Sequence, residues 1–269
     1  SRGKRICCVP LRFSALPRIL LLFLVGSTVS PIIHTLFHTA FNLSSIEMVL
    51  SLTQFFFPSF HCSNSSLTVD ETTKQDDATR ANVQDYYGKN LQTSDDLATN
   101  ACCTAGAPPI YIQQCIAQLH PTTVAKYYGC GLCLPDYDLT GCRVLDLGCG
   151  AGRDVYIASQ LVGPTGSVTG IDMTDEQLQA ARDQQSYHAD KFGHANVDFQ
   201  KGYLESLDDI ESLEPNSFDV IISNCVINLC TDKKAVLESC YKLLKPGGEM
   251  YFSDVYANRR VPESLQKNP

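Results

Sequence analysis

Three glycines at alternate positions, together with two acids, form the part of the sequence that is best suited to hold a ligand. Gly148, Gly150 and Gly152 follow Asp146 in the pattern D-x-G-x-G-x-G. Apolar residues with strand character precede this pattern, and a segment with helical spacing follows from Arg153. Glycine permits the unusual dihedrals of such a turn and lets a ligand approach the main chain. A second acid, Asp172, ends the next apolar strand, where the ribose hydroxyls of a nucleotide-type cofactor would lie.

This pattern resembles motif I of the class I S-adenosylmethionine-dependent methyltransferases. It differs from the dinucleotide fingerprint G-x-G-x-x-G, and an acid beside the loop suits a cofactor that carries an ammonium and a sulfonium instead of phosphates. The resemblance implies S-adenosylmethionine as cofactor. The expected cofactor-binding residues are Asp146, Gly148, Gly150, Gly152, Asp172, Met173, Glu205 and Asn224. For Glu205 two interpretations remain open, contact with the adenine or a place beside the solvated acidic turn at 208–214.

The elements that must position these residues alternate regularly along the second half of the chain. Strands are predicted at 143–147, 167–172, 197–200, 218–223 and 249–255, and helices from Arg153, at 174–192 and at 232–244, with a turn at 245–248. Earlier helices are predicted at 76–91, from Pro108 to Leu119, and from Pro121. This order predicts an α/β fold with a doubly wound, mostly parallel, Rossmann-like sheet and an N-terminal helical cap. The last two strands of the class are expected to be missing, which would leave a free sheet edge.

The chain divides into four predicted parts. Residues 141–256 are the methyltransferase core, 71–140 a cysteine-bearing helical cap, and 257–269 the tail of a C-terminally truncated chain. Residues 1–70 are an atypical extension in which a basic start precedes an apolar run at 19–25. A signal peptide, a membrane span and upstream sequence joined by a gene model are the three interpretations, with Met48 as an alternative start. Membrane association is expected only if this extension is natural.

Composition restricts the partners of this chain of 269 residues. A formal net charge of −8 and an isoelectric point near 5.2 argue against a nucleic-acid partner, because phosphates need a basic surface. The chain also carries thirteen cysteines. They are either reduced cytoplasmic thiols or, in part, ligands for a soft atom.

Several cysteine-bearing motifs extend the resemblance. The segments at 83–88, 100–102, 127–132, 145–154, 170–174, 223–229 and 251–256 are similar, in this order, to those of the arsenite methyltransferase family, over about residues 80–262. The resemblance implies that Cys130 and Cys225 bind arsenic. It also implies that Cys102 takes part in redox cycling by disulfide exchange with Cys130, so that all three are catalytic. Glutathione or thioredoxin would supply electrons to a cytoplasmic, monomeric enzyme whose substrate is trivalent arsenic.

Other readings of the same residues stay open. Cys115 and Cys240 are expected to be core residues, and Cys142 and Cys149 to be structural. Cys130 and Cys133 form a C-x-x-C pair that lacks a convincing second pair for zinc. His120, His188 and His194 are expected at the surface or at helix ends. The alternative functions are a non-catalytic module that sequesters the metalloid or the cofactor, and a methyltransferase for another small molecule.

Overall fold

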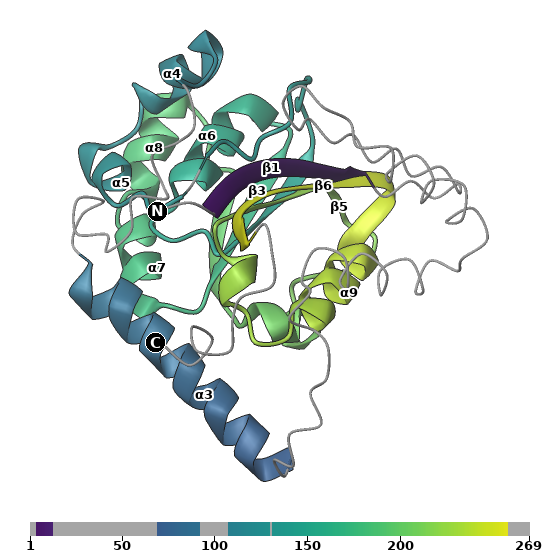
Figure 1. The fold of residues 1–269 in the computed structure, drawn as a ribbon. Helices are drawn as coiled ribbons and strands as arrows, with labels where there is room; N and C mark the ends of the chain where they lie inside the picture. Colours follow the sequence, from purple (N-terminus) through teal and green to yellow (C-terminus); the bar gives the residue numbers. More distant parts are fainter. Residues whose placement is uncertain (1–3, 13–68, 92–106, 130, 258–269) are drawn as a thin grey trace.

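One sheet with helices on both faces organises the structure, a computed structural model that describes residues 4–12, 69–91, 107–129 and 131–257 (Figure 1). The strands lie in the order β1-β6-β5-β2-β3-β4, and β2 to β6 are parallel. The strands are β1 (Lys4–Arg12), β2 (Arg143–Leu147), β3 (Ser167–Asp172), β4 (Val197–Lys201), β5 (Phe218–Asn224) and β6 (Leu244–Ala257). This confirms the predicted parallel, doubly wound sheet.

The helices frame this sheet and also supply a cap. The α-helices are α3 (Val69–Asp85), α4 (Ile110–Ile116), α5 (Pro121–Ala125), α6 (Arg153–Val162), α7 (Asp175–Arg182), α8 (Gln185–Phe192) and α9 (Lys233–Leu243). A π-helical turn, η3 (Tyr86–Asn90), continues α3, and two short 3₁₀ helices are η6 (Leu204–Asp209) and η7 (Ile227–Leu229). Asp232 caps α9 by accepting a hydrogen bond of 2.9 Å from the amide of Ala235, which explains where that helix begins.

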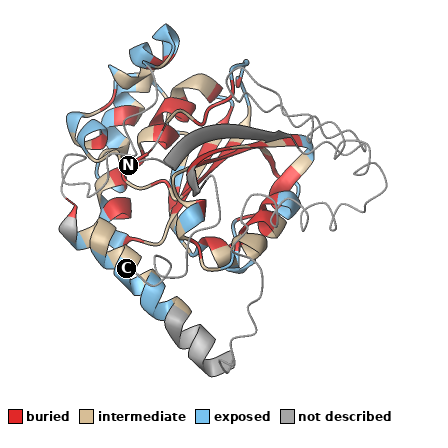
Figure 2. Ribbon diagram, in the orientation of Figure 1, coloured by how far each residue is buried: buried red, intermediate tan, exposed pale blue. Residues whose placement is uncertain are grey.

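The core consists of two apolar layers, one on each face of the sheet. Because side chains alternate along a strand, Leu145 and Leu147 of β2 pack on one face and Val144 packs on the other. The first layer includes residues of α9 and η6, and the second includes residues of α4, α6 and α7. Figure 2 shows the buried residues along the strands and on the helix faces turned toward them. This burial on both faces explains the continuous apolar runs of β2 and β5.

The structure corrects several element boundaries. The single helix predicted at 174–192 is broken at Asp183 and Gln184 into α7 and α8. The turn predicted at 245–248 lies inside β6, where the pairing register with β5 shifts. The cap helix starts earlier than predicted, at Val69, and its predicted last residues form the π-helical turn. Such turns often occur at functional sites.

The expectation of a free sheet edge beside the last strand is wrong. β1 pairs antiparallel with β6 from Lys4 opposite Ala257 to Arg12 opposite Glu249, so the edge of β6 is covered. An exposed strand edge offers unpaired amides and carbonyls, and a further strand satisfies them. Part of the segment interpreted as an atypical extension therefore belongs to the sheet. The apolar run at 19–25 lies outside the described residues, and no helix in the described part is long and apolar enough to cross a bilayer.

The prediction for His188 is also wrong, because this ring is only 1% exposed. It stacks on Tyr156 with a centroid separation of 3.6 Å. Its Nε2 accepts a hydrogen bond from the amide of His120, and its Nδ1 lies 2.8 Å from the carbonyl of Gln184, which fits a neutral ring protonated at Nδ1. Burial lowers the pKa of His188 to about 4. His188 is thus a core residue that joins α8 to the start of α5.

Candidate functional site

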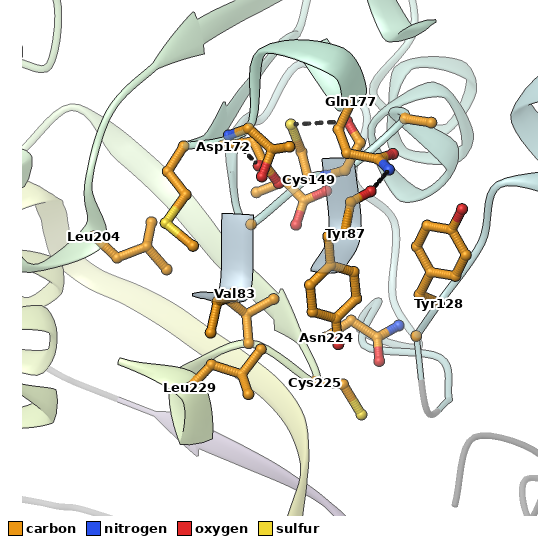
Figure 3. A pocket seen from close by; sticks show the side chains of 18 of the residues that line it. Val83, Tyr87, Tyr128, Cys149, Asp172, Gln177, Leu204, Asn224, Cys225 and Leu229 are labelled. Atoms are coloured by element: carbon orange, nitrogen blue, oxygen red, sulfur yellow. Dashed lines mark hydrogen bonds between the residues drawn. The ribbon is translucent and has the colours of Figure 1, made fainter. Parts of the chain in front are cut away.

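A cavity of about 130 Å³ opens at the carboxyl ends of β2, β3 and β5. Open parallel sheets bind ligands at this end, where loops between strands and helices converge. Figure 3 shows Asp172, Cys149 and Gln177 at one end of the cavity and Asn224, Cys225 and Leu229 at the other. Most of the predicted cofactor-binding residues line it, namely Asp146, Gly148, Gly150, Asp172, Met173, Glu205 and Asn224.

The glycine loop forms the floor of this cavity. Gly148 has φ +70°, and a Cβ at this position would collide with the side chain of Val226. Gly152 is the exception among the predicted residues, since it does not line the cavity. Gly152 instead has φ +83° and caps the N-terminus of α6, where a Cβ would lie 2.8 Å from the ring of Phe199. The first glycine keeps the loop close to the cavity, and the third allows α6 to pack on the sheet.

Asp172 connects the glycine loop to the end of β3. One carboxylate oxygen accepts a hydrogen bond of 2.8 Å from the amide of Gly150, and the other accepts one of 2.9 Å from the amide of Thr174. Burial nevertheless raises the pKa of Asp172. Burial, followed by the charges of Asp154 and Asp172, raises the pKa of Asp146 well above its ordinary value. A cationic ligand in this cavity would lower both pKa values and so stabilise the charged carboxylates.

Gln177 is a cavity residue that the sequence analysis missed. Its side-chain Nε2 donates a hydrogen bond of 2.7 Å to the carbonyl of Tyr87, as Figure 3 shows, whereas its Oε1 is buried without a hydrogen-bond partner. A buried acceptor without a partner is costly unless a ligand satisfies it. The only signal in the sequence was a polar residue in the helix that follows the strand-end acid. Gln177 therefore offers an acceptor to a ligand hydroxyl or amine.

The cap helix contacts both ends of the cavity. Gln84 donates a hydrogen bond of 2.9 Å to the carbonyl of Met173, beside the strand-end acid. Arg80 donates one of 3.1 Å to the hydroxyl of Thr231, and its Nε lies 3.7 Å from a carboxylate oxygen of Glu205. That same oxygen accepts hydrogen bonds from the amide and the hydroxyl of Thr231. Glu205 thus lines the cavity and also holds α3 in place through Arg80. The alternative interpretation, a place beside the solvated acidic turn, is therefore not observed.

Among the predicted thiols, Cys225 lies in the described part, whereas Cys102 and Cys130 lie outside it. Cys225 follows β5 with φ +60°, a left-handed conformation that costs about 1–3 kcal/mol in a non-glycine residue. Its amide donates a hydrogen bond of 2.6 Å to the carbonyl of Ser253. Such strain concentrates at functional sites and here places Cys225 at the wall of the cavity.

Cys225 is disulfide-bonded, and its partner is not among the other cysteines with described side chains, because these form no disulfide. Two of these cysteines, Cys149 and Cys230, also line the cavity. Burial raises the pKa of Cys230 to about 12, so this sulfur stays protonated. Cys133 and Cys240 are buried, and Cys115 and Cys142 are half-buried. Within the described residues no group of His, Cys, Asp and Glu could hold a metal ion.

Asn224 lines the cavity and also forms hydrogen bonds with other segments of the chain. Its Nδ2 lies 2.7 Å from the hydroxyl of Tyr127, 2.6 Å from the carbonyl of Gly131 and 2.9 Å from a carboxylate oxygen of Asp154. These acceptors come from the loop after α5 and from the first turn of α6. The side chain of Asn224 thus connects three segments at the end of β5.

Comparisons with known proteins agree with this geometry. Residues 138–269 match the sequence profile of a family described as a methyltransferase domain. The chain is 56% identical over 186 residues to an arsenite methyltransferase of Aquipseudomonas alcaligenes, a match that covers 69% of this chain and 53% of the relative. It is 49% identical over 195 residues to the arsenite methyltransferase of Mus musculus, which covers 71% of this chain and 51% of the relative.

A solved structure supports the same relationship. The crystal structure of an arsenic(III) S-adenosylmethionine methyltransferase from Chlamydomonas reinhardtii superposes with a TM-score of 0.58 at 48% identity. The superposition covers 61% of this chain and 55% of that one. The chain therefore spans about half the length of the curated relatives that it matches.

Proposed function

Because this chain belongs to the class I S-adenosylmethionine-dependent methyltransferases and is homologous to the arsenite methyltransferases, we propose that it contributes the cofactor site and an arsenic-binding thiol to the methylation of trivalent arsenic. The single observation that supports this most is the position of Cys225. Its sulfur-bearing side chain stands at the wall of the same cavity that Asp172 and the glycine loop line. The thiol of Cys225, a soft ligand, and the proposed cofactor site thus line the same cavity.

The residues of the cavity fit S-adenosylmethionine. When bound, this cofactor supplies an electrophilic methyl group on a sulfonium. Asp172 and Gln177 present acceptors to hydroxyl or amine donors, and the absence of a Cβ at Gly148 keeps the main chain accessible. A cationic ligand would stabilise the charged forms of Asp146 and Asp172, which burial disfavours. Tyr87 and Val83 of the cap line one side of the cavity.

Trivalent arsenic is the proposed substrate because it is soft and binds thiolates. Its lone pair is nucleophilic, so that methyl transfer needs alignment and exclusion of water instead of a general base. The arsenic lone pair would form the arsenic–carbon bond as the sulfur–carbon bond breaks and the thioether leaves, so that arsenic is formally oxidised by two electrons. An external thiol reductant, glutathione or thioredoxin, would return them. By the family resemblance Cys130 is the second arsenic ligand and Cys102 its disulfide-exchange partner.

The proposed activity is expected in a reducing compartment of the cell. The free thiols of Cys115 and Cys142 suit a reducing compartment, which supports a cytoplasmic location. We also expect the chain to act as a monomer on a small-molecule substrate. The remaining alternative is a module that binds cofactor or metalloid without catalysis, and the assay below separates the two.

The test measures cofactor binding, arsenic binding and methyl transfer with the reduced chain. We expect S-adenosylmethionine binding by calorimetry and transfer of labelled methyl to arsenite in the presence of glutathione. Cys225→Ser should keep cofactor binding and lose both arsenic binding and methyl transfer. Cys142→Ser is the matched control, since Cys142 is a free thiol outside the cavity. Binding without any transfer supports the sequestering module, and unchanged transfer by Cys225→Ser contradicts the proposal.

A further inference from the structure

The side chain of Gln177 lies between the cavity and the pair formed by α3 and η3, which is called the cap helix unit below. Gln177 is only 3% exposed. Its Nε2 donates a hydrogen bond of 2.7 Å to the carbonyl of Tyr87 in η3, which Figure 3 shows as a dashed line. Because a carbonyl only accepts hydrogen bonds, this contact identifies the nitrogen end of the amide. The oxygen end must therefore point elsewhere.

The oxygen of Gln177 lies beside the glycine loop. Its Oε1 is buried without a hydrogen-bond partner, and Gln177 lines the cavity. A Cβ built on Gly150, another residue of the cavity, would lie 3.9 Å from this oxygen. A buried acceptor without a partner is costly, so a ligand that donates a hydroxyl or ammonium hydrogen to it is favoured. One amide thus presents its acceptor to the cavity and its donor to the cap helix unit.

The cap helix unit rests on the segment that directly follows β3. A Cβ at Gly88 of η3 would lie 2.7 Å from Oε2 of Glu176 and 3.1 Å from Cγ2 of Thr174, so η3 packs directly on the first turn of α7. Gln84 of α3 donates a hydrogen bond of 2.9 Å to the carbonyl of Met173. A shift of Gln177 would therefore be felt by a main-chain turn that is in close contact with α7.

We propose that Gln177 is a positioning residue that couples occupation of the cavity to docking of the cap helix unit. A donor on the ligand holds Oε1, and the planar amide then keeps Nε2 directed at the carbonyl of Tyr87. Each of the two contacts restricts the amide for the other, so the second contact costs less conformational entropy than the first. This inference rests on the proposed function, because it takes S-adenosylmethionine as the ligand. It goes beyond a contact with the cofactor, which by itself would leave the cap helix unit unaffected.

Thermodynamic linkage makes this coupling reciprocal. If the cofactor strengthens docking of the cap helix unit, docking strengthens cofactor binding by the same factor. One net hydrogen bond corresponds to a factor of about 10. Gln84 does not line the cavity, yet loss of its bond to Met173 should also lower the affinity for the cofactor. A role of Gln177 confined to ligand contact predicts no such effect of Gln84.

Hydrogen exchange of the amides at 84–91, with and without saturating S-adenosylmethionine, tests the coupling. In the unchanged chain we expect the cofactor to slow this exchange about 10-fold. Gln177→Met keeps the length of the side chain and removes both polar ends. It should bind the cofactor about 10-fold more weakly and, at saturation, slow the exchange by less than about 3-fold. The ratio of exchange rates with and without cofactor is the readout, because a merely structural role would change both rates together.

A control and a second variant accompany this measurement. Gln179→Met is the matched control, since Gln179 is an exposed residue of the same helix that bonds to Asp183. It should behave as the unchanged chain. Gln84→Met leaves Gln177 in place and removes the bond to the carbonyl of Met173. It should speed exchange at 84–91 without cofactor and lower the affinity for S-adenosylmethionine several-fold.

The outcomes separate this inference from the proposed function. If the unchanged chain does not bind S-adenosylmethionine, the proposed function fails and the inference fails with it. If the cofactor binds but exchange at 84–91 does not respond, or responds equally in Gln177→Met, the inference alone is overturned. Should Gln177→Met not fold, Gln84→Met decides, because unchanged cofactor affinity in that variant also overturns the coupling. A response that is kept in Gln179→Met and lost in Gln177→Met supports it.

Discussion

The carboxylate of Asp172 accepts a hydrogen bond of 2.8 Å from the backbone amide of Gly150. The two residues come from the ends of neighbouring parallel strands, β2 and β3, so their contact follows from the register of the sheet. The contact holds the glycine loop against the strand-end acid. The proposed cofactor site is thus fixed by backbone geometry as well as by side-chain type.

The first prediction concerns this contact. In Asp172→Asn one oxygen is replaced by an NH2 group that cannot accept from Gly150 or Thr174. Hydrogen bonds to a charged group contribute about 1.5–3 kcal/mol, so S-adenosylmethionine should bind about 10- to 100-fold more weakly in calorimetry. Asp198→Asn is the control, because Asp198 is exposed on the edge strand β4. Equal affinity of Asp172→Asn and the unchanged chain would contradict this role.

The second prediction separates backbone strain from collision in the glycine loop. Gly193→Ala places alanine at φ +76°, in the left-handed helical region, with no atom within 4 Å, and should cost only about 1–2 kcal/mol in urea unfolding. Gly148→Ala has a similar dihedral but also meets Val226, so it should cost more and reduce cofactor binding. Adding Val226→Ala should recover part of the loss. No recovery in the double variant would show that Val226 is not the obstacle.

The third prediction tests whether the cap helix retains the cofactor. Arg80→Met keeps the apolar stem but removes the contacts with Thr231 and Glu205 that hold α3. Bound S-adenosylmethionine should then dissociate several-fold faster in stopped-flow measurements. Lys89→Met is the control on the same cap, since its ion pair with Asp85 is exposed and such pairs contribute little. Unchanged dissociation from Arg80→Met would exclude a retaining role for α3.

The fourth prediction follows from the buried ring of His188. Its pKa is about 4 in the folded chain and near 6.5 when exposed, so between these values the unfolded chain binds a proton that the folded chain does not. The free energy of unfolding should therefore fall as pH drops from about 6.5 to about 4, by a few kcal/mol, since one pKa unit corresponds to about 1.4 kcal/mol.

His188→Gln should flatten this pH dependence in urea unfolding, whatever its effect on stability at pH 7. His194→Gln is the matched control, because His194 is half-buried and bonded to the carbonyl of Ser159. It should keep the full dependence. Identical slopes in both variants would show that His188 does not titrate in this range.

Local patterns in the amino-acid sequence were enough to predict the parallel sheet and the glycine loop. The alternation of apolar strands and amphipathic helices, together with the glycines after Asp146, depends on periods of a few residues. Strand ends then bring Asp146, Asp172 and Cys225 to one cavity, because parallel strands share a carboxyl edge. For that reason most of the predicted cofactor-binding residues line the cavity.

Contacts between distant parts of the chain were decided only by tertiary packing. Asn224 meets Tyr127 across 97 positions and Asp154 across 70, and β1 pairs with β6 across more than 230. The free acceptor of Gln177 and the burial of His188 likewise depend on which helices lie against them. Amphipathic periodicity indicates which face of an element is buried but not which partner buries it, and that choice depends on the packing of the whole fold.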